Sequence, residues 1–102
     1  MTRRWRQRCE CRLTVLGSQR DTQAFRNSAW DAILRLRHPE LVETSPCRFV
    51  CQFETEAPAL HRLQRLSKLH PQLVLLLDYE AHRLKGLAKA KAGALEHCEV
   101  GY

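Results

Sequence analysis

Residues 47–55 read CRFVCQFET, and their alternation decides the predicted fold. Every second side chain is apolar, which is the pattern of a strand with one buried face. The face expected in the core carries Cys47, Phe49, Cys51 and Phe53. The opposite face carries Arg48, Val50, Gln52 and Glu54. An apolar strand face needs a covering layer, so helices are expected in the segments on either side.

The segment before this strand predicts a strand, a helix and a loop. Residues 9–16 alternate in the same way and end at Gly17. Apolar residues then recur at spacings of three and four, which predicts one helix over residues 19–37 that stops before Pro39. Residues 38–46 read HPELVETSP, and their prolines and glutamates predict a connecting loop.

The segment after it predicts a second helix and further strands. Pro58 suits the first turn of a helix that continues to His70. Residues 72–80 read QLVLLLDYE and are apolar on both faces as far as Leu77, which is typical of a central strand. A tight turn at residues 81–82 leads to a strand over residues 83–91, whose lysines are typical of a sheet edge. Alternation in residues 94–102 allows a short C-terminal edge strand.

This order of elements predicts an α+β fold, a ferredoxin-like βαβαββ two-layer sandwich. Each strand–helix unit followed by another strand requires a crossover, which places both helices on one face of an antiparallel sheet. The length of 102 residues fits one domain. We expect that domain to span residues 9–102, behind a basic arm formed by residues 1–8.

Part of the chain resembles a known family. Between residues 53 and 86, a strand that ends in Phe-x-Thr is followed by a proline that opens a helix, by a Leu-Ser pair within that helix and by a second proline. A strand that contains Tyr-Glu and a later glycine complete the pattern. The matching positions are Phe53, Thr55, Pro58, Leu66, Ser67, Pro71, Tyr79, Glu80 and Gly86. This segment resembles the YubB-like ferredoxin-fold domain of bacterial and mobile-element proteins. The resemblance implies a ferredoxin-like fold and carries no catalytic chemistry.

The five cysteines indicate a reducing compartment. Their odd number and the lack of an apolar run behind the N-terminal charges favour free thiols in the cytoplasm. No apolar run approaches the length that spans a bilayer. Cys47 and Cys51 on one strand would be separated by roughly 13 Å, too far to share a zinc ion. We therefore expect no metal, no cofactor, no membrane and no assigned catalytic residue.

The net charge of +6 is concentrated at the N-terminus. Residues 1–12 contain five arginines and one glutamate, and so hold four of the six net charges. Such an arm can neutralise phosphates and bind nucleic acid. The residues expected to do so are Arg3, Arg4, Arg6 and Arg8.

The most favoured function is that of a non-enzymatic interaction module. The outward face of the predicted sheet carries aliphatic residues that need covering, which favours a homodimer formed face to face. The residues expected to self-associate are Val50, Val74, Leu76 and Leu87, with Leu16 near one end. Two alternatives remain open: a nucleic-acid-binding accessory protein that uses the arm, and a small enzyme. The enzyme would use His38, His82 or a cysteine in a cleft between the sheet and loop 38–46.

Overall fold

The computed structural model describes residues 8–101, which form six strands and three helices. The strands are β1 (Cys9–Leu16), β2 (Arg37–Ser45), β3 (Arg48–Thr55), β4 (Val74–Ala81), β5 (Leu84–Lys91) and β6 (Ala94–Gly101). The helices are α1 (Gln19–Arg26), α2 (Trp30–Leu34) and α3 (Leu60–Leu69). Residues 1–7 and 102 lie outside the described range.

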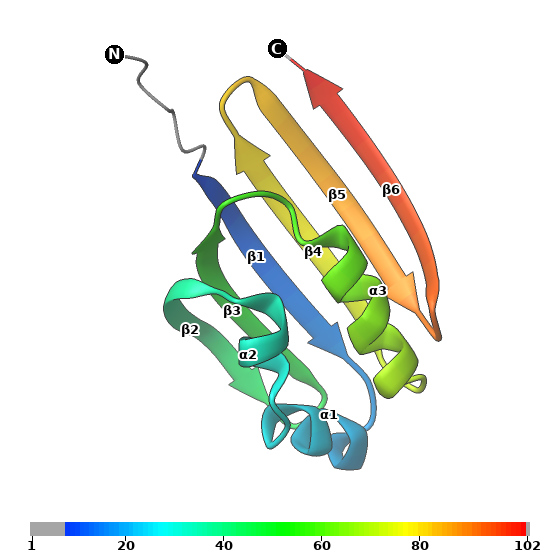
Figure 1. Ribbon diagram of the computed structural model, residues 1–102. Helices are drawn as coiled ribbons and strands as arrows, with labels where there is room; N and C mark the ends of the chain where they lie inside the picture. Colours follow the sequence, from blue (N-terminus) through cyan, green and yellow to red (C-terminus); the bar gives the residue numbers. More distant parts are fainter. Residues whose placement is uncertain (1–7, 102) are drawn as a thin grey trace.

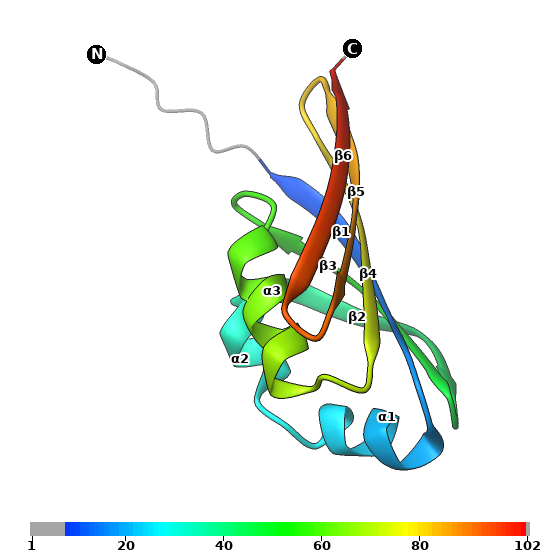
Figure 2. The same ribbon diagram turned by 90° about the vertical axis from the view of Figure 1, so that its right-hand side faces the viewer.

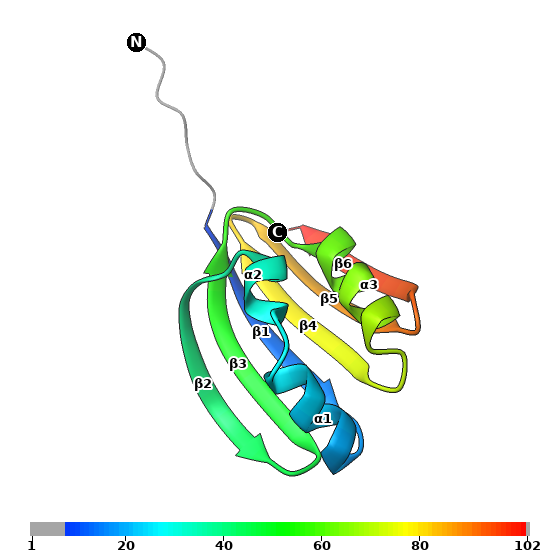
Figure 3. The ribbon, with the colours of Figure 1, turned by 60° about the horizontal axis from the view of Figure 1, so that its bottom comes forward.

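The six strands form one antiparallel sheet in the order β2-β3-β1-β4-β5-β6 (Figure 1). All three helices lie on the same face of this sheet (Figure 2). We call the opposite face, which none of these helices covers, the open face. Strands β2 and β6 form the two edges (Figure 3).

The predicted ferredoxin-like βαβαββ sandwich with two helices is wrong. The described chain runs β-α-α-β-β-α-β-β-β, and both the number and the order of its strands differ from that prediction. Three errors in the sequence interpretation account for the difference: a missed strand, a helix that is divided, and a strand over residues 83–91 that was read as a sheet edge.

The missed strand is β2, which occupies the segment predicted to be a loop. Nearly all of its residues are exposed, so neither face carries an apolar pattern. Proline is tolerated on an edge strand because the ladder there has a partner on one side only. Pro39 lies within the first of two register irregularities between β2 and β3, and the second lies between Leu41 and Glu43. The prolines and glutamates of residues 38–46, which predicted a loop, are therefore compatible with an edge strand.

The single helix predicted over residues 19–37 is divided into α1 and α2. The chain leaves the helix at Asn27 and Ser28, where the Ser28 N–H bonds to the Phe25 carbonyl at 3.0 Å. The Ser28 hydroxyl donates to the same carbonyl at 2.6 Å. Short polar side chains of this kind compete with helical hydrogen bonds. Arg35 ends α2 in the left-handed conformation, which frees Arg37 to begin β2.

The third error concerns the sheet edge, which is formed by β6. This strand occupies Ala94–Gly101, where the alternation allowed an edge strand. It pairs with β5 in one unbroken register from Lys91↔Ala94 to Leu84↔Gly101. Strand β5 is therefore internal, and its lysines do not mark a sheet edge. The turn between the two strands is tied to α3, since the Gly93 N–H donates to Ser67 Oγ at 2.9 Å and Gln64 Nε2 donates to the Gly93 carbonyl at 2.8 Å.

The core lies between the sheet and the helices. Phe49 and Phe53 are buried there, as their alternation predicts. Phe25 stacks on Trp30 with ring centroids 5.4 Å apart, and Trp30 meets Phe49 edge-on at 5.3 Å. Aromatic pairs at these separations add about 0.5–1.5 kcal/mol each beyond the area they bury. This cluster fixes α1 and α2 to β3, while Leu63 and Leu66 bring α3 onto the sheet.

Candidate functional site

The open face of the sheet carries aliphatic side chains that are strongly exposed. Leu87 is 50% exposed and Val100 is 60% exposed. Leu87 lies directly opposite Cys98, and Val100 lies two residues further along β6, opposite Lys85. We call Leu87, Cys98 and Val100 the β5–β6 patch.

The structure places the four residues expected to self-associate in different environments. Val50 is only 3% exposed, so it offers almost no surface to a partner. Val74 and Leu76 are half-buried on β4. Leu76 is a diagonal neighbour of Leu87, because Leu76 faces Lys89 and Asp78 faces Leu87. The exposed apolar surface therefore lies at the β5–β6 end of the open face, away from Val50.

Sequence reasoning missed the contribution of Val100 to this surface. Its alternation with Cys98 is visible in the sequence, but the face of the final strand depends on its register with β5. The feature that would have assigned the face of Val100 is a turn signal at Ala92-Gly93, because this turn pairs the final strand back onto residues 84–91.

Next to the β5–β6 patch, the open face contains a charged hollow of about 340 Å³. Its polar side chains come from β1 to β5: Glu10, Arg12, His38, Glu40, Gln52, Glu54, Asp78, Glu80 and Lys85. Glu10 faces Glu54 on one side and Glu80 on the other. Like charges directly opposite one another are unfavourable in a sheet, and this row brings three carboxylates together.

Arg12 partly balances the carboxylates of the hollow. It lies between Gln52 and Asp78 in the sheet. With the Gln52 amide oriented so that its oxygen faces Arg12, Nη2 and Nε of Arg12 donate to that oxygen at 2.9 and 3.3 Å. The hollow is thus a mixed-charge surface with an excess of carboxylates.

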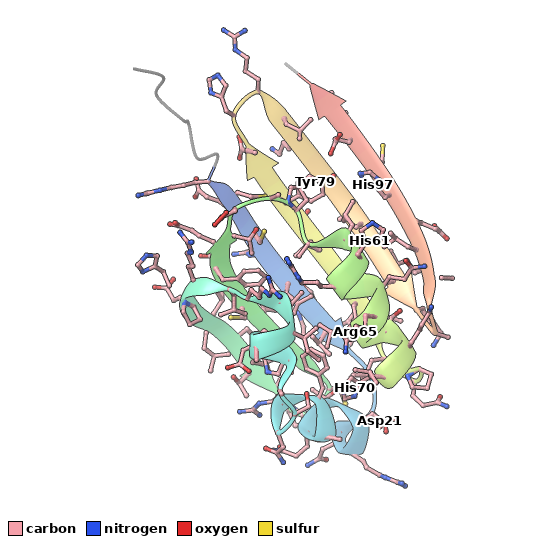
Figure 4. The ribbon with its side chains drawn as sticks, viewed as in Figure 1. Asp21, His61, Arg65, His70, Tyr79 and His97 are labelled. Carbon is pink, nitrogen blue, oxygen red and sulfur yellow. The ribbon has the colours of Figure 1, made fainter. Side chains whose placement is uncertain are left out.

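A hydrogen-bonded cluster on the helix-bearing face links β4 to β6. Figure 4 shows Tyr79 and His97 beside each other. The Tyr79 hydroxyl donates to Glu99 Oε2 at 2.7 Å. Because its single proton is used there, the hydroxyl accepts from His97 Nε2 at 2.8 Å. His97 Nε2 also lies 3.6 Å from Glu99 Oε2.

This cluster is suited to structure more than to catalysis. Burial raises the pKa of Tyr79 above its ordinary value, and the adjacent Glu99 carboxylate raises it further. The hydroxyl therefore stays protonated and is a poor base or nucleophile. Its two hydrogen bonds reach across β5 at Gly86, where the Tyr79 ring occupies the space that a Cβ would fill.

Three of the five cysteines are buried and two are exposed, and all five are free. The Sγ atoms of Cys9 and Cys11 are 3.7 Å apart, and Cys11 Sγ lies 3.6 Å from Thr55 Oγ1. The hydrogen bond from Cys11 lowers the pKa of Cys9, whereas that bond and burial together raise the pKa of Cys11. Both thiols are enclosed by the core, so large substrates cannot reach them. Among residues 8–101, no group of three or more histidines, cysteines or carboxylates is placed to hold a metal ion.

The cleft expected for the alternative small enzyme does not form as predicted. Its loop is strand β2, which belongs to the sheet. His38 lies on β2 and lines the charged hollow, whereas His82 is exposed in the turn between β4 and β5.

The predicted nucleic-acid-binding arm falls mostly outside the described residues. Arg3, Arg4 and Arg6 lie in residues 1–7, and only Arg8 is described, as an exposed residue before β1. The arm therefore remains a prediction from the sequence.

The comparisons with known proteins identify no relative. No family model, curated protein or solved structure matches the chain. The resemblance to the YubB-like domain thus stays a prediction. No helix in the described part of the chain has the length and apolar character needed to cross a membrane.

Proposed function

We propose that this protein is a non-enzymatic interaction module that forms a homodimer through the open side of its sheet. The observation that carries the proposal is the exposure of Leu87 and Val100, next to each other at the β5–β6 end of that face. Isolated exposed aliphatics are ordinary, whereas neighbouring ones on an uncovered sheet are typical of a contact surface.

Pairing of identical chains is the simplest way to cover this surface. A twofold axis brings the same patch of each chain next to the other, so one patch provides both halves of the contact. Leu76 lies diagonal to Leu87 and extends the apolar surface toward the middle of the sheet.

The polar groups of the described residues favour binding over catalysis. Tyr79 is held protonated by burial, and the close thiol pair is enclosed. Five free thiols suit a reducing environment, so the proposal includes a cytoplasmic location.

Sedimentation velocity across a range of protein concentrations tests the proposal. The informative variant is Leu87→Lys, which places a charge in the proposed interface. Its matched control is Leu69→Lys, because Leu69 is 58% exposed but lies on α3, on the opposite side of the sheet. We expect a dimer for the wild type and for Leu69→Lys, and a dissociation constant raised about tenfold or more for Leu87→Lys. A wild type that stays monomeric up to about millimolar concentration, a range of weak affinity, would refute the proposal.

A further inference from the structure

The two edges of the sheet differ in how well they are protected from pairing. On β2, Pro39 and two register irregularities interrupt the edge. Strand β6 shows neither device: its register with β5 is unbroken, and residues 94–101 contain no proline and no lysine. An eight-residue regular strand at a sheet edge presents a row of backbone groups ready to pair with another strand.

The hairpin between β5 and β6 determines which backbone groups point outward. Ala92 and Gly93 both have positive φ, 50° and 88°, as a two-residue type I′ turn requires. Lys91 and Ala94, which flank the turn, form the closing hydrogen-bonded pair, and such pairs alternate along the ladder. Cys98 therefore bonds to β5, while His97 and Glu99 direct their N–H and C=O groups to the free edge.

We propose that β6 pairs antiparallel with β6 of a second copy, with the twofold axis passing between the two Cys98 residues. This inference rests on the proposed self-association and places its twofold axis at the β6 edge of the sheet. In this register His97 of each copy lies opposite Glu99 of the other, and Glu96 lies opposite Val100. The β5–β6 patches of the two copies then join, since Leu87 and Cys98 of each chain lie in one continuous row across the seam.

Charge selects this register over its neighbours. An axis at Glu96 or Glu99 would place two carboxylates directly opposite each other, which is unfavourable. An axis at His97 would place two imidazoles opposite each other and would pair Glu99 with Leu95. Of the four registers centred on residues 96–99, only the one at Cys98 pairs a histidine with a carboxylate on each side of the axis.

The cysteine at the axis provides a direct measurement. Because Cys98 bonds to β5, the two Cys98 residues would form a non-hydrogen-bonded pair, whose Cα atoms are about 4.5 Å apart. This separation lies within the range of about 4.4–6.8 Å that a disulfide spans. Diamide accepts one hydrogen from each thiol as the two Sγ atoms join, so it should link the chains covalently.

The experiment treats the full chain with diamide and separates the products on non-reducing gels. The matched control exploits the other exposed cysteine, Cys47. We expect a covalent dimer from the wild type and from Cys47→Ser, and only monomer from Cys98→Ser. The register is checked in a background lacking Cys47 and Cys98: a mixture of Glu96→Cys and Val100→Cys chains should link more completely than either chain alone.

Sedimentation velocity separates this inference from the proposed function. Cys98→Lys places two ammonium groups at the axis and should raise the dissociation constant about tenfold or more, whereas Cys47→Lys should leave it unchanged. A dimer that persists in Cys98→Lys, or that is not linked through Cys98, would overturn the β6 pairing and leave self-association standing. A wild type that is monomeric throughout would overturn both.

Discussion

Replacing Gly86 by alanine should loosen β6 from the rest of the sheet. Gly86 lies between Tyr79 on β4 and Glu99 on β6. A Cβ at position 86 would overlap Cζ and Oη of Tyr79 and would lie 2.6 Å from its Cε2. The Tyr79 ring is 2% exposed and spans this gap to reach His97 and Glu99. It cannot remain there beside an alanine.

The size of the effect follows from three contributions. Overpacking a buried position costs about 1–3 kcal/mol. Loss of the hydrogen bonds of the Tyr79 hydroxyl costs about 1 kcal/mol more, since Glu99 and His97 are partly solvated. Alanine is better than glycine within a strand by roughly 0.5–1 kcal/mol, which offsets part of the loss. We expect the free energy of unfolding to fall by about 2 kcal/mol, which corresponds to roughly 10 °C in Tm for a domain of this size.

Urea denaturation followed by circular dichroism measures this change. Gly101→Ala is the matched control, because a Cβ there would meet its nearest atom, the Arg83 carbonyl oxygen, at an ordinary 3.6 Å. A second control places Gly86→Ala in a Tyr79→Val background, where the overlap is absent and the alanine should cost little. If Gly86→Ala is as stable as Gly101→Ala, or costs the same in both backgrounds, the role assigned to the Tyr79 ring is wrong.

Two further predictions concern groups that hold β6 in place. Ser67→Ala should lower the free energy of unfolding by about 1–3 kcal/mol, because it leaves the Gly93 N–H without its side-chain acceptor; an unchanged urea midpoint would contradict this. Because burial raises the pKa of Tyr79, the folded state holds the phenolic proton more tightly than the unfolded state. The free energy of unfolding should therefore fall as pH rises above about 10, the ordinary pKa of tyrosine. Tyr79→Phe should remove this part of the alkaline loss in urea titrations at pH 9 to 11, and an identical alkaline slope in the two proteins would count against it.

Alternation predicted the buried faces of the inner strands but not the exposure of the opposite face. Phe49 and Phe53 are in the core because each second residue of a strand points the same way. The same parity assigned Val50 to the open face, where it lies between Thr14 and Glu43 and is nonetheless buried. The odd or even position of a residue in a strand determines the face of its side chain, whereas its exposure depends on the neighbouring strands. For Val50, one of these neighbours is β2, which the sequence analysis missed.

The Tyr79 cluster could not be predicted because it depends on a two-residue difference in register. A turn at residues 81–82 would place Tyr79 opposite Leu84. The observed turn at His82 and Arg83, with Arg83 at a φ of 59°, places Tyr79 opposite Gly86. Both registers put Tyr79 on the same face, so the hydrophobic pattern cannot distinguish them. Only the second leaves room for the ring to cross β5.

Strand β6 reverses the usual distribution of polar and apolar side chains, and this reversal has a physical reason. Its residues on the helix-bearing face include His97 and Glu99, which bind the buried Tyr79 hydroxyl. Its residues on the open face include Cys98 and Val100, which are exposed. Contacts within the chain explain why the inward residues are polar. Among the described residues, no such contact explains why the outward residues are apolar. A second β6 across the free edge would supply one for Cys98, because it would place the second Cys98 beside the first and satisfy the outward backbone groups of His97 and Glu99 in the same step.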